Sequence, residues 1–222
     1  MRTSNRLRVF QAFLVVVVSG SLTSGALKAQ QLSIVGGPPL SKPRLPRIER
    51  PWTEVERELL EPRERDGQVM GVWSTCANAP DLCRSWLVFT DYLLRESSLP
   101  VRDRELLILR IAWLTHGAYE WSAHVGLALR SGLSDEDVHR ILDGPEAPGW
   151  NTWDQTLLRV VDELHREAFV SDEIWAQLSA RYDRRQLMEA IFTVGQYNLV
   201  AMWVNSVGVQ LETGLEGFPV DP

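Results

Sequence analysis

Cysteine is scarce in this chain. Its 222 residues include only Cys76 and Cys83, and these two are not separated by the two-residue gap of Cys-x-x-Cys motifs. On one continuous helix they would lie ~10 Å apart along the axis, too far for a disulfide. Pro80 predicts that one helix ends and another begins between the two cysteines, so a disulfide between them remains one of two alternatives. The alternative is two small buried apolar side chains.

An excess of basic residues is also lacking. The chain has 23 Lys and Arg against 29 Asp and Glu, which gives a formal net charge of -6. Removal of residues 1–29, a predicted leader, leaves 19 basic against the same 29 acidic residues, a net charge of -10. This balance repels nucleic-acid phosphates and anionic membrane surfaces. We therefore expect no nucleic-acid partner, and no stable membrane association after leader cleavage.

The N-terminal apolar run is too short to cross a bilayer, which takes about 20 residues. This run, Val9–Val18, follows a positive segment and precedes small residues, with cleavage predicted after Ala26 or Ala29. These features are typical of a secretory signal peptide over residues 1–29. The region has no Cys for a lipid anchor and no twin Arg, so we predict an exported protein, periplasmic or extracellular. An uncleaved N-terminal anchor is the alternative.

Strand-like alternation of polar and apolar residues is absent as well. Apolar residues from Trp52 onward recur at helical spacing, which predicts an all-α fold with a single helical domain over residues 52–211. Five prolines and a Gly-Gly pair interrupt residues 30–51, which we predict to be a linker or an arm that wraps the domain. Residues 212–222 are expected to form a polar tail.

Local signals place several helix starts. Thr53 and Glu56 have the spacing of a capping box, and so do Ser134 and Asp137. Ser171 precedes another acidic first turn and is a further expected N-cap.

Two segments are expected to be buried. After Glu105, residues 101–115 are apolar almost all round, which predicts a helix buried on every side. In residues 79–98 one helical stripe contains Leu82, Trp86, Phe89 and Leu93.

The stretch YEWSAHVGLALRSG, residues 119–132, places Glu120 and His124 four residues apart on one helix face, beside an apolar stripe. Gly132 is a natural residue to end this helix. A carboxylate beside an imidazole can transfer protons near neutral pH. The simpler interpretation is a surface ion pair, worth about 0.2–0.5 kcal/mol.

A metal site is a further alternative for the same stretch. His116, Glu120 and His124 are spaced four and four, and Glu105 can add a ligand. Because His116 precedes Gly117 at a predicted turn, the three need not share a face. We therefore expect no metal site.

Residues 105–141, ELLILRIAWLTHGAYEWSAHVGLALRSGLSDEDVHRI, resemble the carboxymuconolactone decarboxylase family, which includes the alkylhydroperoxidase-D-like proteins. Two later segments, residues 157–165 and 171–212, resemble the C-terminal half of the same family. The resemblance spans most of residues 52–211. It implies an all-helical domain that assembles with itself as a homo-oligomer.

The peroxidase branch of this family uses a Glu, then a Cys-x-x-Cys pair, then a His. The resemblance places Glu105 and His124 at the Glu and His positions, while Gly117 and Glu120 occupy the two cysteine positions. No thiolate is then present to attack a peroxide. The chain is similar to the cysteine-free branch, typified by the decarboxylase, and an alkylhydroperoxidase or peroxiredoxin-like antioxidant function is the disfavoured alternative.

The decarboxylase resemblance implies cofactor-independent proton transfer on a small organic acid or lactone, by decarboxylation or a related conversion. The substrate's own conjugated carbonyl takes the electrons, so we expect no cofactor. His124 is the expected acid and base, with Glu120 and Glu105 orienting it. Expected substrate-binding residues are Trp113, Trp121, Tyr197, Trp203 and, for a carboxylate, Arg110.

Two alternatives stay open for these residues. Arg110 can instead pair with a buried or interface carboxylate, and Tyr197 can be a hydrogen-bonding residue between packed helices. For the whole chain, the third interpretation is a non-catalytic helical binding module.

Overall fold

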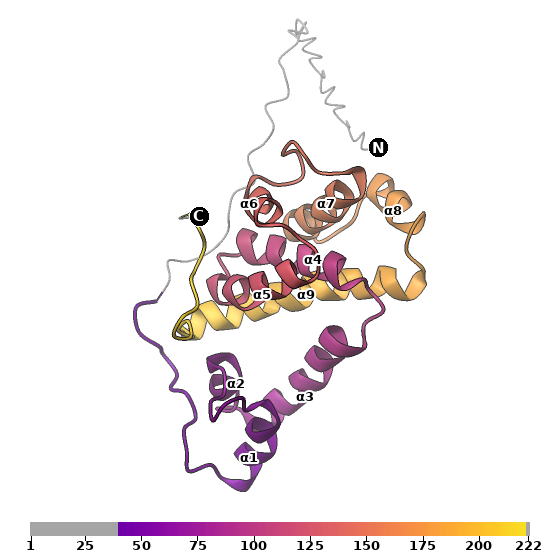
Figure 1. Ribbon diagram of the computed structural model, residues 1–222. Helices are drawn as coiled ribbons and strands as arrows, with labels where there is room; N and C mark the ends of the chain where they lie inside the picture. Colours follow the sequence, from indigo (N-terminus) through magenta and orange to yellow (C-terminus); the bar gives the residue numbers. More distant parts are fainter. Residues whose placement is uncertain (1–39, 221–222) are drawn as a thin grey trace, which may run out of the picture. The chain divides into compact units, whose positions relative to one another are not determined.

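The computed structural model describes residues 40–220, so the predicted leader lies outside the described residues. The described part is all-α, as predicted, with one isolated bridge between Arg65 and Gln68. No helix in it combines the length and apolarity needed to cross a membrane. The helices of Figure 1, in chain order, are α1 (Glu54–Leu60), the 3₁₀ helix η1 (Glu61–Arg63), α2 (Gly71–Cys76), α3 (Pro80–Asp91), the π-helix η2 (Tyr92–Glu96), α4 (Val101–Leu114), α5 (Ala118–Arg130), α6 (Asp135–Asp143), α7 (Thr152–Glu167), α8 (Asp172–Ser179) and α9 (Arg184–Val207).

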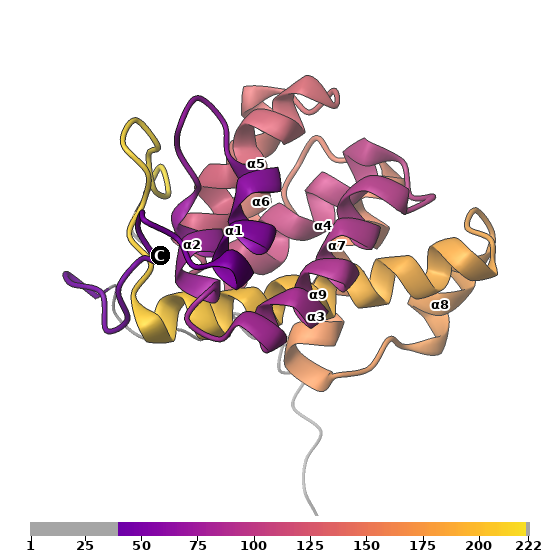
Figure 2. The same cartoon turned by 90° about the horizontal axis from the view of Figure 1, so that it is seen from below.

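Helix α4 is the centre of the domain. Every residue from Asp103 to Leu114 is buried, which confirms the prediction of a helix enclosed on all sides. It packs against α5, α7 and α9, and both views of the ribbon show it among these helices (Figures 1 and 2). Since α4 has no solvent-facing side, its charged residues need partners inside the protein.

The predicted helix caps are confirmed. The side chains of Thr53, Ser134 and Ser171 each accept a hydrogen bond from a backbone N–H in the first turn of α1, α6 and α8. Gly132 follows α5 with φ of +105°, the left-handed region that favours glycine. Short-range capping chemistry thus decided these boundaries.

The predicted apolar stripe on α3 is wrong at its first residue. Leu82 is 70% exposed, and the buried residues of α3 are Cys83, Leu87 and Thr90. The buried face is rotated because α3 packs beside α1, where Cys83 and Leu87 join an apolar cluster. The π-helical turn of η2 then changes the angular spacing and brings Leu93 inside.

The two ends of the described chain pack on the domain. In residues 40–51, the Arg44 N–H donates to the Val207 carbonyl (2.7 Å) and the Ile48 N–H to the Ser74 carbonyl (3.0 Å). In the tail, the Phe218 ring lies 5.1 Å from that of Trp113 and 5.4 Å from that of Trp121, between centroids. No sequence pattern predicted that Phe218 completes this aromatic cluster.

A buried ion pair joins α4 to α7. Arg110 donates through Nε and Nη2 to both oxygens of Asp162, at 2.7 and 3.0 Å, and through Nη1 to the Ile141 carbonyl at 2.7 Å. Only 3% of Arg110 and 5% of Asp162 is exposed. Removing one partner leaves the other charge buried and unpaired, which costs about 3–5 kcal/mol in proteins.

We therefore expect Asp162→Ala to lower the free energy of unfolding by about 3–5 kcal/mol, measured by urea denaturation. The matched control is Glu146→Ala, which breaks the Arg159–Glu146 pair at the surface, where Glu146 is 75% exposed. That change should cost less than about 1 kcal/mol. Equal costs for the two variants would contradict a structural role for the Arg110–Asp162 pair.

Candidate active site

The site is built around a buried carboxylate on α4. Glu105 has no exposed surface, and its Oε2 lies 2.7 Å from Nδ1 of His124 on α5. Its Oε1 accepts from the guanidinium of Arg104, at 3.1 and 3.2 Å. Because an ionised carboxylate only accepts hydrogen bonds, the Nδ1 atom of His124 carries a proton. Glu105 thus fixes the ring orientation and the tautomer of His124.

Tyr197 on α9 completes a chain of three side chains. Its hydroxyl oxygen lies 3.0 Å from Nε2 of His124, and the two rings meet edge to face with centroids 4.9 Å apart. In the neutral ring Nε2 accepts from the Tyr197 O–H. Burial, followed by the charge of Glu105, raises the pKa of Tyr197 well above its ordinary value, so the hydroxyl keeps its proton.

Glu120 stands apart from this chain of hydrogen bonds. It is 3% exposed, and neither carboxyl oxygen has a hydrogen-bond partner in the described part of the protein. Burial raises the pKa of Glu120 to about 7. The expectation that Glu120 orients His124 is therefore wrong, because Glu105 makes that contact. Near neutral pH, Glu120 can instead hold or release a proton of its own.

Gly117 makes room for the Glu120 carboxyl. A Cβ atom at position 117 would lie 2.7 Å from Oε2 of Glu120 and 3.4 Å from the Ala112 carbonyl oxygen. These are the two positions that hold thiols in the peroxidase branch of the family that the sequence resembles. The glycine and the carboxylate thus form a matched pair, since the carboxyl fills the space beside the missing side chain.

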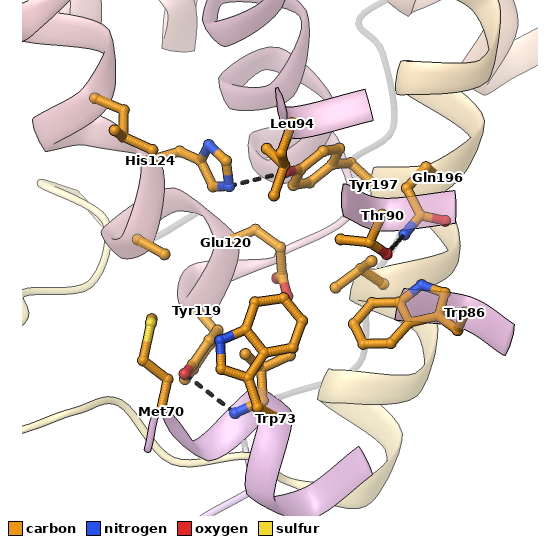
Figure 3. Close-up of a pocket in the computed structure, with 14 residues that line it drawn as sticks. Met70, Trp73, Trp86, Thr90, Leu94, Tyr119, Glu120, His124, Gln196 and Tyr197 are labelled. Carbon is orange, nitrogen blue, oxygen red and sulfur yellow. Dashed lines mark hydrogen bonds between the residues drawn. The ribbon is translucent and has the colours of Figure 1, made fainter. Parts of the chain in front are cut away.

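His124, Tyr197 and Glu120 line one cavity of about 180 Å³. In the view of Figure 3, Glu120 lies between the His124–Tyr197 end and two tryptophans, Trp73 and Trp86. Most of the remaining wall is apolar, and neither Arg nor Lys is among its described lining residues. The Gln196 amide donates to Thr90 Oγ1 at 2.8 Å and adds a polar edge. The cavity therefore suits a small and largely apolar ligand.

Four of the expected substrate-binding residues do not line this cavity. Arg110 pairs with the buried carboxylate of Asp162, which is the alternative that the sequence left open. Its guanidinium is therefore not free to hold a substrate carboxylate. Trp113 and Trp121 pack in the main core beside Phe218. Trp203 lies behind the wall, its ring 5.6 Å from that of Trp86. Tyr197 alone of the five lines the cavity.

Sequence reasoning missed the wall formed by α2 and α3. Met70, Val72 and Trp73 at α2, together with Trp86 and Thr90 on α3, line the cavity opposite His124. Alpha-helix α2 has only six residues and no side-chain cap, so no periodic or capping signal reveals it.

The geometry does not favour the metal alternative. His116 lies outside α5, in the turn after α4, with φ of +54°. Within residues 40–220, no group of three His, Cys, Asp or Glu side chains is arranged to hold an ion. Glu105, the fourth proposed ligand, is already shared by Arg104 and His124.

Comparison with known proteins gives this arrangement a context. A sequence model of the Carboxymuconolactone decarboxylase family matches residues 80–163, which include Glu105, Glu120 and His124. An uncharacterized peroxidase-related protein from Silicibacter sp. TM1040 shares the fold with a TM-score of 0.68 at 12% identity, over 80% of this chain and 95% of that one. The carboxymuconolactone decarboxylase model thus matches the central part of the chain, and the fold is that of AhpD-like proteins.

Two further structures share this fold. An alkylhydroperoxidase AhpD core protein from Ralstonia eutropha JMP134, described as peroxidase-related, has a TM-score of 0.62 at 15% identity, over 72% of this chain and 86% of that one. The debrominase Bmp8, solved as a cysteine-to-alanine variant with 2,3,4-tribromopyrrole, has a TM-score of 0.58 at 16% identity. The match covers 75% of this chain and 90% of that one. No curated protein sequence matches the chain.

The raised pKa of Glu120 predicts that stability falls as pH rises. The carboxyl titrates at 4.5 when unperturbed and at about 7 in the folded protein, so the folded state binds more protons between these values. This contribution is fully present below about pH 4.5 and is lost as pH rises through about 7. From pH 4.5 to pH 8, the free energy of unfolding of the wild type should fall by roughly 3 kcal/mol relative to that of Glu120→Gln.

Urea denaturation at a series of pH values measures this difference. Glu173→Gln, at an exposed carboxyl of α8, is the control and should follow the wild type. If Glu120→Gln also follows the wild type across this range, Glu120 ionises as freely as an exposed side chain.

Proposed function

We propose that this protein is a cofactor-independent enzyme that transfers protons on a small carboxylated lactone or related organic acid. The observation that carries the proposal is an unpaired, buried carboxyl, Glu120, in the same cavity as the Glu105–His124–Tyr197 chain. The family match over residues 80–163 and the AhpD-like fold support a related enzyme or antioxidant-like function. The donor set of this cavity favours acid–base chemistry.

Decarboxylation fits the cavity wall. A carboxylate held against apolar side chains loses its hydration, and the departing CO₂ is uncharged, so an apolar environment favours the products. The lack of Arg and Lys among the described lining residues agrees with this, since a cation would stabilise the starting carboxylate. Glu120 must be protonated to admit an anion, because two like charges repel in such a site.

The proposed proton path follows the hydrogen bonds. The bond between the carboxyl carbon and the neighbouring substrate carbon breaks, and its electron pair moves into the conjugated carbonyl of the substrate. His124 first takes a proton from solvent at Nε2. The substrate carbon then takes the proton of the Tyr197 hydroxyl while Nε2–H of His124 returns a proton to the Tyr197 oxygen, so no free phenolate forms. Glu105 keeps its hydrogen bond to Nδ1–H throughout and stabilises the imidazolium.

The size of the expected substrate follows from the cavity. A volume of about 180 Å³ suits one small ring with its substituents. The structure of Bmp8 with 2,3,4-tribromopyrrole supports this scale, because a protein of the same fold there binds a small planar ring. Trp73 and Trp86 can contact such a ring with their faces or edges.

CO₂ release from a panel of carboxylated enol-lactones tests the proposal. His124→Ala should lower kcat/KM by about 10²–10⁴, the usual contribution of a general acid. His139→Ala, at an exposed histidine of α6, is the matched control and should retain full turnover. Activity of the wild type should fall as pH rises through about 7, where Glu120 ionises, and Glu120→Gln should lessen that fall. Full turnover by His124→Ala, or no CO₂ release across the panel, would contradict the proposal.

An antioxidant function is the second candidate, because the structures from Silicibacter and Ralstonia are described as peroxidase-related. A thiol mechanism requires Cys76 or Cys83, since the chain has no other cysteine. Hydroperoxide consumption that disappears in the Cys76→Ser, Cys83→Ser double variant would favour this function. Consumption that survives in the double variant would exclude a cysteine mechanism.

Export and self-association belong to the same proposal. The leader-like residues 1–29 support an exported, periplasmic or extracellular protein. An exposed apolar row on α9 supports a homo-oligomer, because such rows are typical of protein interfaces. Its members are Met188, Phe192, Leu199 and Met202, which are 47–62% exposed.

A charge placed in this row tests the homo-oligomer. Met202→Glu should lower the molar mass in solution, measured by light scattering, relative to the wild type. The control is Trp175→Glu, at an exposed apolar residue of α8 outside the row. A monomeric wild type would contradict self-association.

A further inference from the structure

Alpha-helices α2 and α3 and the short turn between them, called here the α2–α3 hairpin, contain the two cysteines. Alpha-helix α2 ends at Cys76 and α3 begins at Pro80, so the cysteines are not on one continuous helix. Ala79 links their backbones, because its N–H donates to the Cys76 carbonyl (3.0 Å) and its carbonyl accepts from the Cys83 N–H (2.8 Å). The helix geometry that argued against a bridge in the sequence therefore does not apply.

A contact between two tryptophan rings also joins α2 to α3. Trp73 and Trp86, whose ring centroids are 5.5 Å apart, each lie six residues from the Ala79–Pro80 junction. Cys76 and Cys83 each lie three residues from the same junction, one layer nearer the turn. Both cysteines belong to one apolar cluster with Leu87, and Trp73 and Trp86 pack against the same cluster.

The two thiols are in contact and differ in character. The interaction of the two neighbouring thiols raises the pKa of Cys76 and lowers the pKa of Cys83, and the charges of Arg63 and Arg84 lower the pKa of Cys83 further. Cys76 is partly exposed, whereas Cys83 is buried. A pair with one accessible sulfur and one neighbour that readily becomes a thiolate is the arrangement of a dithiol that exchanges with disulfides.

We propose that Cys76 and Cys83 form a redox site that closes to an intramolecular disulfide across the α2–α3 hairpin when it meets a small-molecule disulfide such as oxidised glutathione. This site is separate from the proton-transfer residues of the cavity and does not depend on the proposed function.

The exchange balances in two steps. Cys83, which starts as the thiolate, takes the proton of Cys76, and the accessible Cys76 sulfur attacks the small disulfide, which forms a mixed disulfide and releases one thiolate. Cys83 then loses its proton to solvent and attacks the Cys76 sulfur, which releases the second thiolate. One disulfide bond breaks and one forms, so the two protein thiols are oxidised as the small disulfide is reduced to two thiols.

The site lies next to the cavity wall. Trp73 and Trp86 are one helical layer from the cysteines and line the cavity, so a bond between Cys76 and Cys83 constrains the two helices that carry them. Oxidation should therefore change the surroundings of these two rings, an effect that tryptophan fluorescence can report.

The experiment uses the full chain, reduced and freed of reductant, then equilibrated with glutathione buffers of increasing oxidised fraction. Acid quenching, alkylation in denaturant and peptide mass analysis count the free thiols. We expect both thiols to be lost together, with a crosslinked peptide spanning Cys76 and Cys83, and tryptophan fluorescence to change with the same midpoint. Cys76→Ser and Cys83→Ser should each lack this transition, and Cys83→Ser should retain a glutathione adduct on Cys76.

Three results would overturn the proposal. One is full alkylation of both cysteines of the wild type in the most oxidising buffer. Another is a wild type that accumulates only glutathione adducts or disulfide-linked dimers. The third is a fluorescence change of equal size in the wild type and in the Cys76→Ser, Cys83→Ser double variant. Counting thiols on the wild type keeps the test valid even if a serine variant folds poorly.

Discussion

The fully buried charge of Glu105 is the constraint on which the site depends. A carboxylate without exposed surface is costly unless it is paired and hydrogen-bonded, and here Arg104 and His124 each take one of its oxygens. The same contacts fix the depth of α5 against α4, because His124 must reach across to the central helix. A structural requirement of the core thereby sets the tautomer of the histidine that lines the cavity.

The pair Gly117 and Glu120 changes what this framework can do. Thiols at these positions would supply a nucleophile and a resolving partner, whereas a carboxyl beside a glycine supplies a proton close to neutral pH. A Cβ atom at 117 would meet the end of the Glu120 side chain, which would then have to shift. Glycine at 117 and the carboxyl of Glu120 are therefore compatible neighbours beside the cavity.

The sequence predicted features that depend on near neighbours. The cap at Thr53 and the end of α5 at Gly132 follow from residues within one turn, and the buried character of α4 follows from composition alone. The resemblance to the family supplied Glu105 and His124. The sequence left Arg110 open between a substrate carboxylate and a buried carboxylate, because its partner Asp162 lies 52 residues away, a separation that no periodic pattern reports. The cavity wall at α2 was missed because this short helix has no periodic or capping signal.

The cavity wall formed by α2 is held in place by residues from both ends of the described chain. The Glu212 carboxylate accepts from the Tyr119 hydroxyl (2.9 Å), from Arg47 (2.6 Å) and from the Gly71 N–H at the start of α2. It thus ties a residue of the expected arm and the first turn of α2 to α5. Since α2 is too short to hold its place by itself, Glu212 positions Trp73 against the cavity. Residues that composition assigned to a linker and a tail are therefore part of what shapes the site.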